Sequence, residues 1–452
     1  MDEYDETAVL HDDAAYVLHS WSAQKRLHPI DVVRAQGVRF WDASGKEYLD
    51  FASQLINLNL GHQHPDLVQA ACEQVQRLCT IAPEFANGQR STLARLIVQH
   101  GPIPDGKVFF TNAGADANEN AVRLAREATG RTKVLASYRS YHGATGTAVQ
   151  LTGEGRRTSQ PVLTDPNIVH FWGPYPYRSI FYAATPEEET ARSLEHLEQT
   201  IRAENPQSIA AIILETVVGT NGVLVPPPGY LQGVRALADR YGIMYIADEV
   251  MVGFGRTGSL FAVQRFGVQP DLLTFAKGVN SGYSPLGGVI LSPEIAAVFD
   301  EHPYPGGLTY SGHPLGCAIG VRTFEVFERD HLLEHVRDLE ARVLQPWLRH
   351  MAELHPSVGE ARGVGLFAAL ELVSDRASRA QLGPIEAGGA DNPLVALRAA
   401  AIERGLWPVV HGNRVHIAPP LIIDETDLRA GLDILDEVLS VADAAVRGPR
   451  VS

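Results

Sequence analysis

The chain has 452 residues, of which 45% are hydrophobic and 20% charged, and its formal net charge is −15. This composition is typical of a globular protein of two or three domains. The acidic balance argues against nucleic acid or an anionic membrane as a partner. Residues 1–13 contain no apolar stretch like that of a signal peptide, and Cys72, Cys79 and Cys317 lack a metal-ligand spacing. We therefore expect a cytoplasmic protein with reduced thiols and no membrane span.

The first predicted elements form a small meander of strands. Residues 32–51 alternate apolar and polar side chains around a turn signal at residues 42–45. The loop that follows, residues 54–65, contains His62 and His64. Two histidines without a nearby third ligand are typical of hydrogen-bonded loop residues, so we predict no metal site here.

Helical spacing predicts helices over residues 66–79 and 91–100. A buried strand, 107–111, then leads through a glycine-containing turn, 112–120, into a helix over 120–129. This layout suits an anion, because the first N–H groups of a helix are free and carry partial positive charge. A glycine turn is also common in αβ units that bind nothing, so both interpretations stay open at this point.

Strands and helices continue to alternate up to residue 292, which predicts an α/β fold with a mostly parallel sheet covered on both faces. In such sheets the ligand lies beyond the carboxyl ends of the strands. The further predicted strands are 133–137, 209–216, 243–249, 272–276 and 288–292, with helices over 190–205 and 229–241.

Several chemically useful side chains fall at the carboxyl ends of separate predicted strands. Lys277 follows the apolar run 272–276 directly. An apolar setting lowers the pKa of a lysine and makes its neutral amine a nucleophile, although a lone lysine at a strand end is usually solvated. The convergence of five strand ends favours one shared site, and its members are Thr111, Tyr141, Glu215, Asp248 and Lys277.

The pattern changes after residue 320 to that of a smaller α+β domain. We expect residues 56–320 to form the large domain, residues 321–452 the small one, and residues 1–55 to contribute to the small domain. The predicted elements beyond the large domain are a helix over 316–351, a strand over 363–372, a helix over 393–404, short strands at 406–410 and 415–417, and a helix over 424–441.

The predicted site suits pyridoxal 5′-phosphate (PLP). A lysine can form a Schiff base with the cofactor and move protons, and a buried carboxylate keeps the pyridine nitrogen protonated so that the ring accepts electrons. An aromatic side chain stacks on the ring, and free N–H groups at a helix start hold the phosphate.

Longer motifs then identify a family. The chain resembles the class III, fold-type I PLP-dependent aminotransferases over nearly its whole length, and within them it is most similar to taurine–pyruvate and other ω-amino acid–pyruvate aminotransferases. The resemblance implies a PLP-dependent transferase of fold type I, with a large domain around a mostly parallel sheet and a smaller α+β domain. The matching stretches are 53–65, 109–126 (FFTNAGADANENAVRLAR), 140–143, 215–222, 246–258 (IADEVMVGFGRTG), 275–288 (FAKGVNSGYSPLGG), 307–314 and 418–423.

The resemblance also assigns roles to single residues. Lys277 is the expected Schiff-base lysine, Asp248 the partner of the pyridine nitrogen, and Tyr141 the residue that stacks on the ring. Because one contact is expected to come from the neighbouring subunit, the resemblance implies a homodimer, or a dimer of dimers, with shared active sites. The other expected cofactor contacts are His142 beside the ring, Gly114 and Ala115 at the phosphate, Val250 on the ring face opposite Tyr141, Glu215 near the ring, and Thr309 at the phosphate of the neighbouring subunit.

The same resemblance outlines a substrate pocket. Many relatives carry an arginine three residues before the last Pro-Pro pair to bind a substrate carboxylate, and this chain has His416 there. Arg414 lies two residues earlier and faces the same way on a strand, so it is the expected substitute; the alternative is a solvated loop arginine. The other expected pocket walls are Trp21, Leu55, Ile56, Phe85 and Thr220.

We therefore expect a PLP-dependent transaminase that moves an amino group from a taurine-like or β-alanine-like ω-amino acid, or an amine, to pyruvate or another 2-oxo acid. The alternative is other PLP chemistry on the same scaffold, in a decarboxylase or an aminomutase, which needs no stoichiometric acceptor. The intact Lys277, Asp248 and Tyr141 argue against a non-catalytic PLP-fold protein. The motif GFGRTG at 253–258 opens no convincing helix, which argues against an NAD oxidoreductase.

Overall fold

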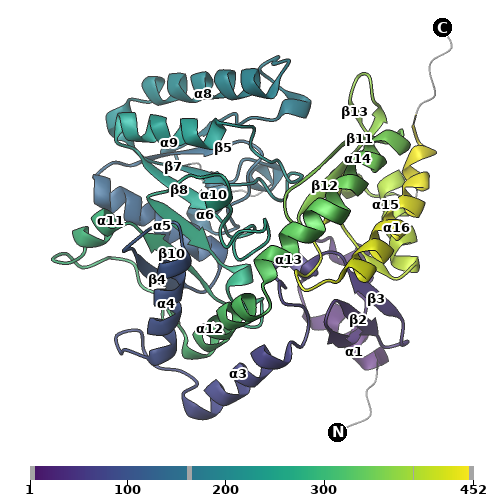
Figure 1. Ribbon diagram of the computed structural model, residues 1–452, viewed down its shortest axis with the longest axis horizontal. Helices are drawn as coiled ribbons and strands as arrows, with labels where there is room; N and C mark the ends of the chain where they lie inside the picture. Colours follow the sequence, from purple (N-terminus) through teal and green to yellow (C-terminus); the bar gives the residue numbers. More distant parts are fainter. Residues whose placement is uncertain (1–5, 160–164, 390, 447–452) are drawn as a thin grey trace.

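The computed structural model describes residues 6–159, 165–389 and 391–446 and is built around a seven-stranded sheet (Figure 1). The strand order is β4-β10-β9-β8-β7-β5-β6, and every strand runs parallel to the others except β10, which is antiparallel to both of its neighbours. The strands are β4 (Lys107–Thr111), β5 (Lys133–Ser137), β6 (Ile168–Phe171), β7 (Ile209–Glu215), β8 (Met244–Asp248), β9 (Leu272–Phe275) and β10 (Gly287–Leu291).

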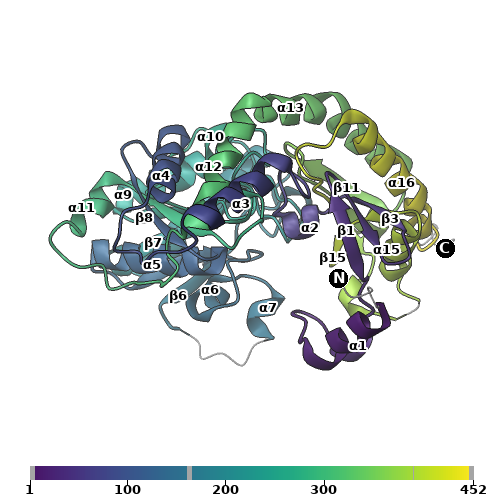
Figure 2. The ribbon, with the colours of Figure 1, turned by 90° about the horizontal axis from the view of Figure 1, so that it is seen from below.

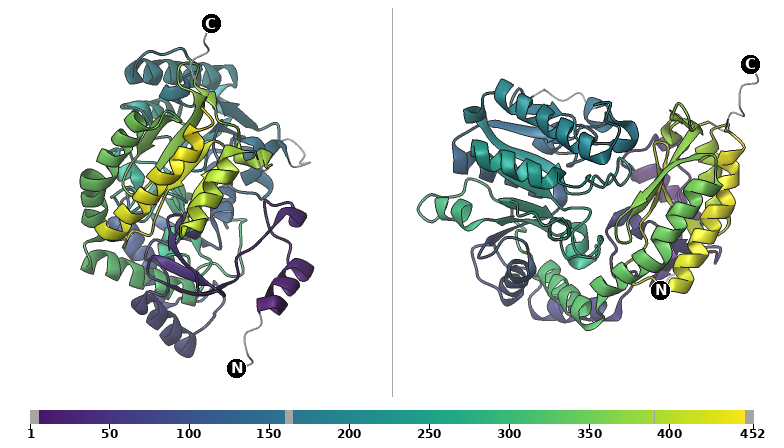
Figure 3. Two further views of the ribbon diagram at one scale, coloured as in Figure 1. Left: turned by 90° about the vertical axis from the view of Figure 1, so that its right-hand side faces the viewer. Right: turned by 45° about the horizontal axis from the view of Figure 1, so that its top comes forward.

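Both faces of this sheet are buried, because successive side chains of each strand enter opposite apolar layers. In β7, Ala211 and Ile213 pack toward α5 (Gly114–Thr129), whereas Ile212 and Leu214 pack toward the layer that contains α8 (Pro186–Ala203) and α9 (Tyr230–Tyr241). Figure 3 shows the helices on the two sides of the sheet. The mostly parallel α/β fold expected from the apolar runs is thus the fold observed. Further helices of this part are α3 (Pro65–Arg77), α4 (Gly88–His100), α6 (Gly146–Leu151), α7 (Gly155–Thr158), α10 (Ala262–Arg265), α11 (Pro293–Val298) and α12 (Pro314–Arg329).

Two predictions for the large part of the chain are wrong in detail. The helix predicted to start at residue 120 begins at Gly114, since Asn118 and Asn120 lie buried inside it instead of forming a turn. The strand β6 was not predicted, because its four residues are too few to show a period.

The smaller part of the molecule holds two further sheets, at the right of Figure 1. One joins the N-terminal strands to the C-terminal region in the order β1-β2-β3-β14, with β14 parallel to β3, and the other has the order β11-β12-β16-β15. The long helix predicted over 316–351 is interrupted after Arg329, where His331 adopts a left-handed φ of 48°. The elements are β1 (Val32–Gln36), β2 (Arg39–Asp42), β3 (Glu47–Asp50), α1 (Glu6–Tyr16), α2 (Ser53–Ile56), α13 (Leu332–Leu339), α14 (Gln345–Leu354), β11 (Val358–Gly363), β12 (Ala368–Asp375), β13 (Ala380–Gln381), α15 (Pro393–Glu403), β14 (Leu406–Trp407), β15 (Val409–His411), β16 (Arg414–Ile417) and α16 (Glu425–Asp443).

Seen from below in Figure 2, the two parts enclose a gap, with α7 on one side and β15 on the other. Within the described ranges, no helix combines the length and apolar character needed to cross a bilayer.

Candidate active site

A cavity of about 860 Å³ opens at the carboxyl ends of the central strands, between the two parts of the molecule. Its walls combine strand ends of the large sheet, the start of α5, the N-terminal segment and the β15–β16 hairpin. Phe85, Thr309 and Arg414 are not among the lining residues. The predicted site residues that do line it are Trp21, Leu55, Ile56, Gly114, Ala115, Tyr141, His142, Glu215, Thr220, Asp248, Val250 and Lys277.

Lys277 lies where β9 ends, at the first residue of a short 3-10 helix, Lys277–Asn280. Its φ of 43° places it in the left-handed region, which is strained for a residue with a side chain and is often found at functional sites. Burial lowers its pKa to about 8, and the negative charges of Asp248 and Glu215 oppose that shift only in part. Lys277 is therefore held as an amine that loses its proton much more readily than a solvated lysine.

Asp248, at the end of β8, is held by His142, Asn118 and the backbone of Val250. Its Oδ2 is 2.7 Å from Nδ1 of His142 and accepts a hydrogen bond of 2.8 Å from Nδ2 of Asn118, while its Oδ1 accepts one from the backbone N–H of Val250. The amide of Asn118 is fixed in turn by Thr274, which donates to Asn118 Oδ1 over 2.8 Å. The predicted site does not include Asn118, because the sequence pattern predicts a turn at that residue.

Glu215 organises the loops around Tyr141. It accepts hydrogen bonds of 2.8 Å from the backbone N–H groups of Tyr141 and of Gly219. Burial raises its pKa to about 7, and Asp248 adds to that rise. Glu215 thus ties two loops of the cavity to the end of β7.

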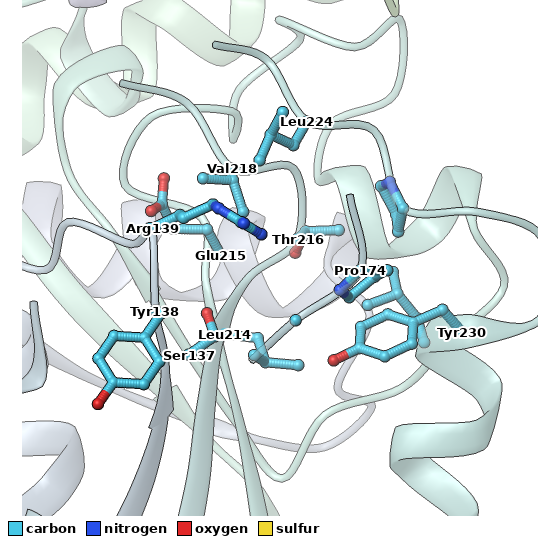
Figure 4. Close-up of a pocket in the computed structure, with 13 residues that line it drawn as sticks. Ser137, Tyr138, Arg139, Pro174, Leu214, Glu215, Thr216, Val218, Leu224 and Tyr230 are labelled. Atoms are coloured by element: carbon cyan, nitrogen blue, oxygen red, sulfur yellow. The ribbon is translucent and has the colours of Figure 1, made fainter. Parts of the chain in front are cut away.

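A much smaller cavity, of about 30 Å³, lies on the other side of Glu215 (Figure 4). Figure 4 shows Arg139 beside Glu215 and the hydroxyl of Tyr230 pointing toward Leu214. That hydroxyl is buried and has no hydrogen-bond partner. The space suits one water molecule and is too small for a substrate.

The start of α5 forms a narrow cradle. A Cβ atom on Gly114 would lie 2.5 Å from Cγ1 of Val250, so only glycine fits there. The helix α5 has 16 residues, and its first backbone N–H groups, beginning with those of Gly114 and Ala115, have no hydrogen-bond partner within the helix. Such groups are well suited to bind an anion.

Arg156 also lines the cavity, and the sequence prediction missed it. Its guanidinium carbon lies 3.7 Å from the centre of the Tyr141 ring and 5.8 Å from that of the Trp21 ring. Its Nε contacts Glu154, whereas its Nη2 is buried and has no hydrogen-bond partner in the described part of the chain. The stretch around Arg156 contains no motif, so its place in the site became visible only in three dimensions.

His416 also lines the cavity, and Arg414 lies outside its lining. The His416 ring is buried, and burial, with the nearby charge of Arg414, lowers its pKa to about 3, although the backbone of Gly219 opposes the shift. Arg414 packs against Gly222, where an added Cβ would lie 2.5 Å from Arg414 Cδ. A neutral imidazole therefore stands where the family resemblance predicts a cation.

Phe85 and Thr309 lie on the surface rather than in the cavity. Phe85 is 53% exposed, and Arg90 contacts both its backbone carbonyl and the segment around Gly312. Thr309 is exposed as well. As for metals, the described residues contain no group of three or more His, Cys, Asp or Glu side chains placed to hold an ion.

Comparison with known proteins decides the family. The model of the class III aminotransferases matches residues 21–439. The chain belongs to this family. A class III aminotransferase uses PLP, and the residues present fit that cofactor. Lys277 has a lowered pKa, Asp248 supplies a carboxylate, Tyr141 supplies an aromatic ring, and the start of α5 has free N–H groups.

Solved and curated relatives agree with the assignment. The structure of taurine:2-oxoglutarate aminotransferase from Bifidobacterium kashiwanohense, in complex with PLP and glutamate, is 41% identical, with a TM-score of 0.94 over 99% of this chain and 100% of the other. Putrescine–pyruvate aminotransferase from Pseudomonas aeruginosa is 34% identical over 92% of this chain and 91% of its own length. 4-Aminobutyrate aminotransferase from Escherichia coli is 35% identical over 92% and 95%.

Proposed function

We propose that this aminotransferase transfers the amino group of a small ω-amino acid with a distal anion, such as taurine, to pyruvate or another 2-oxo acid. The observation that carries the proposal is Arg156, whose side chain lines the cavity and whose Nη2 has no hydrogen-bond partner among the residues that the structure describes. A guanidinium binds a sulfonate or carboxylate through charge-assisted hydrogen bonds. The names of the taurine and 4-aminobutyrate relatives support the substrate class.

The positions of the surrounding residues support the following roles. When bound, PLP would supply the electron sink for the carbon that carries the amine. Lys277 would move the proton at that carbon through Nζ, since its low pKa lets the amine act as a base near neutral pH. Asp248, held by His142 and Asn118, would stabilise positive charge on the ring nitrogen. Tyr141 would cover one face of the ring, and Arg156 stacks on Tyr141.

We also propose that Thr220 narrows the pocket and that two chains share each pair of sites. Thr220 lines the cavity, where its methyl and hydroxyl take up room that a smaller residue would leave free. Thr309 and Phe85 are exposed on a single chain, and a partner's site is the place where both would be used. Thr309 would then contact the phosphate, and Phe85 the substrate, in the neighbouring subunit.

A panel of donors in single half-reactions tests the function. We expect the visible absorbance of the bound cofactor to be lost fastest with taurine and β-alanine, and more slowly with 4-aminobutyrate, ornithine and 1-phenylethylamine. Turnover should then require a 2-oxo acid in stoichiometric amount. Release of CO₂ from a donor without any acceptor would instead indicate a decarboxylase, and product isomeric with the donor an aminomutase.

Arg156→Gln tests the distal anion contact. Loss of a hydrogen bond to a charged group costs roughly 1.5–3 kcal/mol, so KM for taurine should rise about 10- to 100-fold. KM for 1-phenylethylamine, which carries no anion, should change little. Arg157→Gln is the matched control, because Arg157 is not among the lining residues of the cavity. Equal losses with both donors would contradict the assignment of Arg156.

A further inference from the structure

A row of charged side chains connects the small part of the molecule to Arg156. Nδ1 of His411 lies 2.8 Å from Oε1 of Glu386, and its Nε2 lies 3.8 Å from Oε2 of Glu154. The other oxygen of Glu154 contacts Nε of Arg156, which stacks on Tyr141. The row therefore ends at the aromatic ring of Tyr141, which would cover the cofactor.

The row crosses the gap between the two parts of the molecule. His411 ends β15, and Glu386 lies in the short 3-10 helix Ile385–Ala387 of the same part. Glu154 and Arg156 belong to the start of α7 on the other side, which faces β15 in Figure 2. Through His411, the small part of the molecule thus lies against Glu154 of the large part, next to the cavity.

The charges along the row alternate in sign. Glu154, followed by Glu386, raises the pKa of His411 above its usual value, while burial and the charge of Arg156 oppose the rise. His411 in turn helps to lower the pKa of Glu154, and it holds that of Glu386 at about 2. The two carboxylates therefore favour the imidazolium form of His411.

Glu154 can pair with His411 or with Arg156, and this pairing determines which hydrogen bonds Arg156 can still donate to a substrate. With His411 charged, one oxygen of Glu154 faces His411 and the other faces Nε of Arg156, so Nη2 of Arg156 keeps its hydrogen-bonding capacity. With His411 neutral or absent, both oxygens of Glu154 have Arg156 as their nearest cation. A bidentate pair would then occupy the face of the guanidinium that a substrate anion needs.

We infer that His411 is a positioning residue for the distal anion of the substrate: its imidazolium holds Glu154 so that the guanidinium of Arg156, at the cavity wall, can donate to that anion. This inference rests on the proposed function, because the substrate anion is the group that benefits. It places a specificity determinant in the small part of the molecule, outside every motif in the sequence.

A pH dependence follows from this arrangement. Protonated His411 is fully present below the ordinary histidine value of 6.5 and is lost as pH rises through its raised pKa. The groups that face His411 are Glu386 from its own side, Glu154 and Arg156 from α7, and Arg414 across the β15–β16 hairpin. Affinity for an anionic donor should therefore fall with rising pH over that range.

His411→Gln tests the inference in the PLP-loaded enzyme. We expect KM for taurine to rise about tenfold while KM for 1-phenylethylamine stays near the wild-type value. His355→Gln is the matched control, since His355 also lies between two carboxylates, Asp436 and Asp443, but far from the cavity lining. An unchanged KM for taurine, or equal increases for both donors, would overturn the inference.

A binding measurement separates this inference from the proposed function. Ethanesulfonate has no amine and cannot react, so calorimetric titration of the PLP-loaded enzyme reports anion affinity alone. We expect its Kd to increase with pH in the wild type and to be high and independent of pH in His411→Gln. Tight binding without taurine turnover would reject the proposed donor but keep the role of His411. Equal Kd in wild type and variant would reject that role.

Discussion

Lys277 combines a strained backbone with a partly stabilised charge. Its left-handed φ turns the side chain out of the line of β9 and into the cavity, where burial disfavours the ammonium form. Asp248 and Glu215 limit the fall in pKa, so the amine remains able to carry a proton near neutral pH. A group that both gives and takes a proton needs such an intermediate pKa.

Replacement of Lys277 by alanine should abolish the visible absorbance that depends on the bond between lysine and cofactor. Turnover should fall by at least about 10³-fold, because the proton-transfer group is lost with it. Cofactor should still bind through the start of α5, as measured by phosphate content after gel filtration. Lys107→Ala, at an exposed lysine paired with Asp300, is the control that should behave as wild type. A variant at Lys277 that keeps the absorbance band would contradict the assignment.

Capture of PLP by the apoprotein should follow the titration of Lys277. Only the neutral amine attacks the cofactor aldehyde, so the rate should rise with pH and level off above about pH 8, where Lys277 is deprotonated. Stopped-flow absorbance over a series of pH values measures this directly. A rate that keeps rising toward pH 10.5, the ordinary value for lysine, would show that the site does not lower the pKa.

The sequence predicted the residues whose chemistry is tied to strand ends. Lys277, Asp248, Glu215 and Tyr141 each follow a recognisable apolar run, and all four line one cavity. Arg156 escaped prediction because its role depends on stacking against Tyr141, and nothing in its neighbours along the chain shows this.

Among the elements, α5 shows how a helix start can be shaped for a ligand. Its cap residue, Ala113, makes no side-chain hydrogen bond to the free N–H groups, which therefore remain available. Gly114 lets Val250 approach the first turn closely. The element boundary was mispredicted there because asparagine and aspartate favour turns as strongly as helix starts.

Gly114→Ala should weaken cofactor binding without unfolding the protein. The new methyl group would meet Val250 Cγ1 at 2.5 Å and must displace either Val250 or the first turn of α5. We expect Kd for PLP, measured by titration of the apoprotein, to increase about tenfold or more. Gly88→Ala, at the start of the 13-residue helix α4, is the control, since an added Cβ there meets nothing within 4 Å. Equal affinity in the two variants would show that the cradle is not needed.

At the scale of the whole molecule, Glu371 links the two parts. This buried carboxylate on β12 contacts the hydroxyl of Tyr175, Nε of Arg178 and, at 2.9 Å, Nη2 of Arg362. Arg362 also donates from Nε to the carbonyl of Gly222 over 2.6 Å, beside the cavity wall. The relative placement of the two parts, and with it the width of the gap, depends on this network.

Glu371→Gln should destabilise the protein by about 3–5 kcal/mol, because two guanidinium groups would lose a buried partner. Arg362, Tyr175 and Arg178 lower the pKa of Glu371 against the effect of burial, so its contribution is present above pH 4.5 and is lost as pH falls through the lowered value. Denaturant unfolding at pH 7 measures the effect. Asp338→Asn, which removes an exposed ion pair with Arg342, should leave the midpoint almost unchanged. Equal midpoints for the two variants would contradict this role for Glu371.

The parallel pairing of β3 with β14 has a consequence for folding of the protein during its synthesis on the ribosome. Leu49 pairs with Leu406, so the first sheet cannot close until roughly 350 further residues have been synthesised. Until then β1–β3 have an open edge, which is the kind of strand that recruits other chains and aggregates. The nascent N-terminal segment is therefore a natural client for a chaperone, and productive expression should improve when translation is slowed or chaperones are abundant.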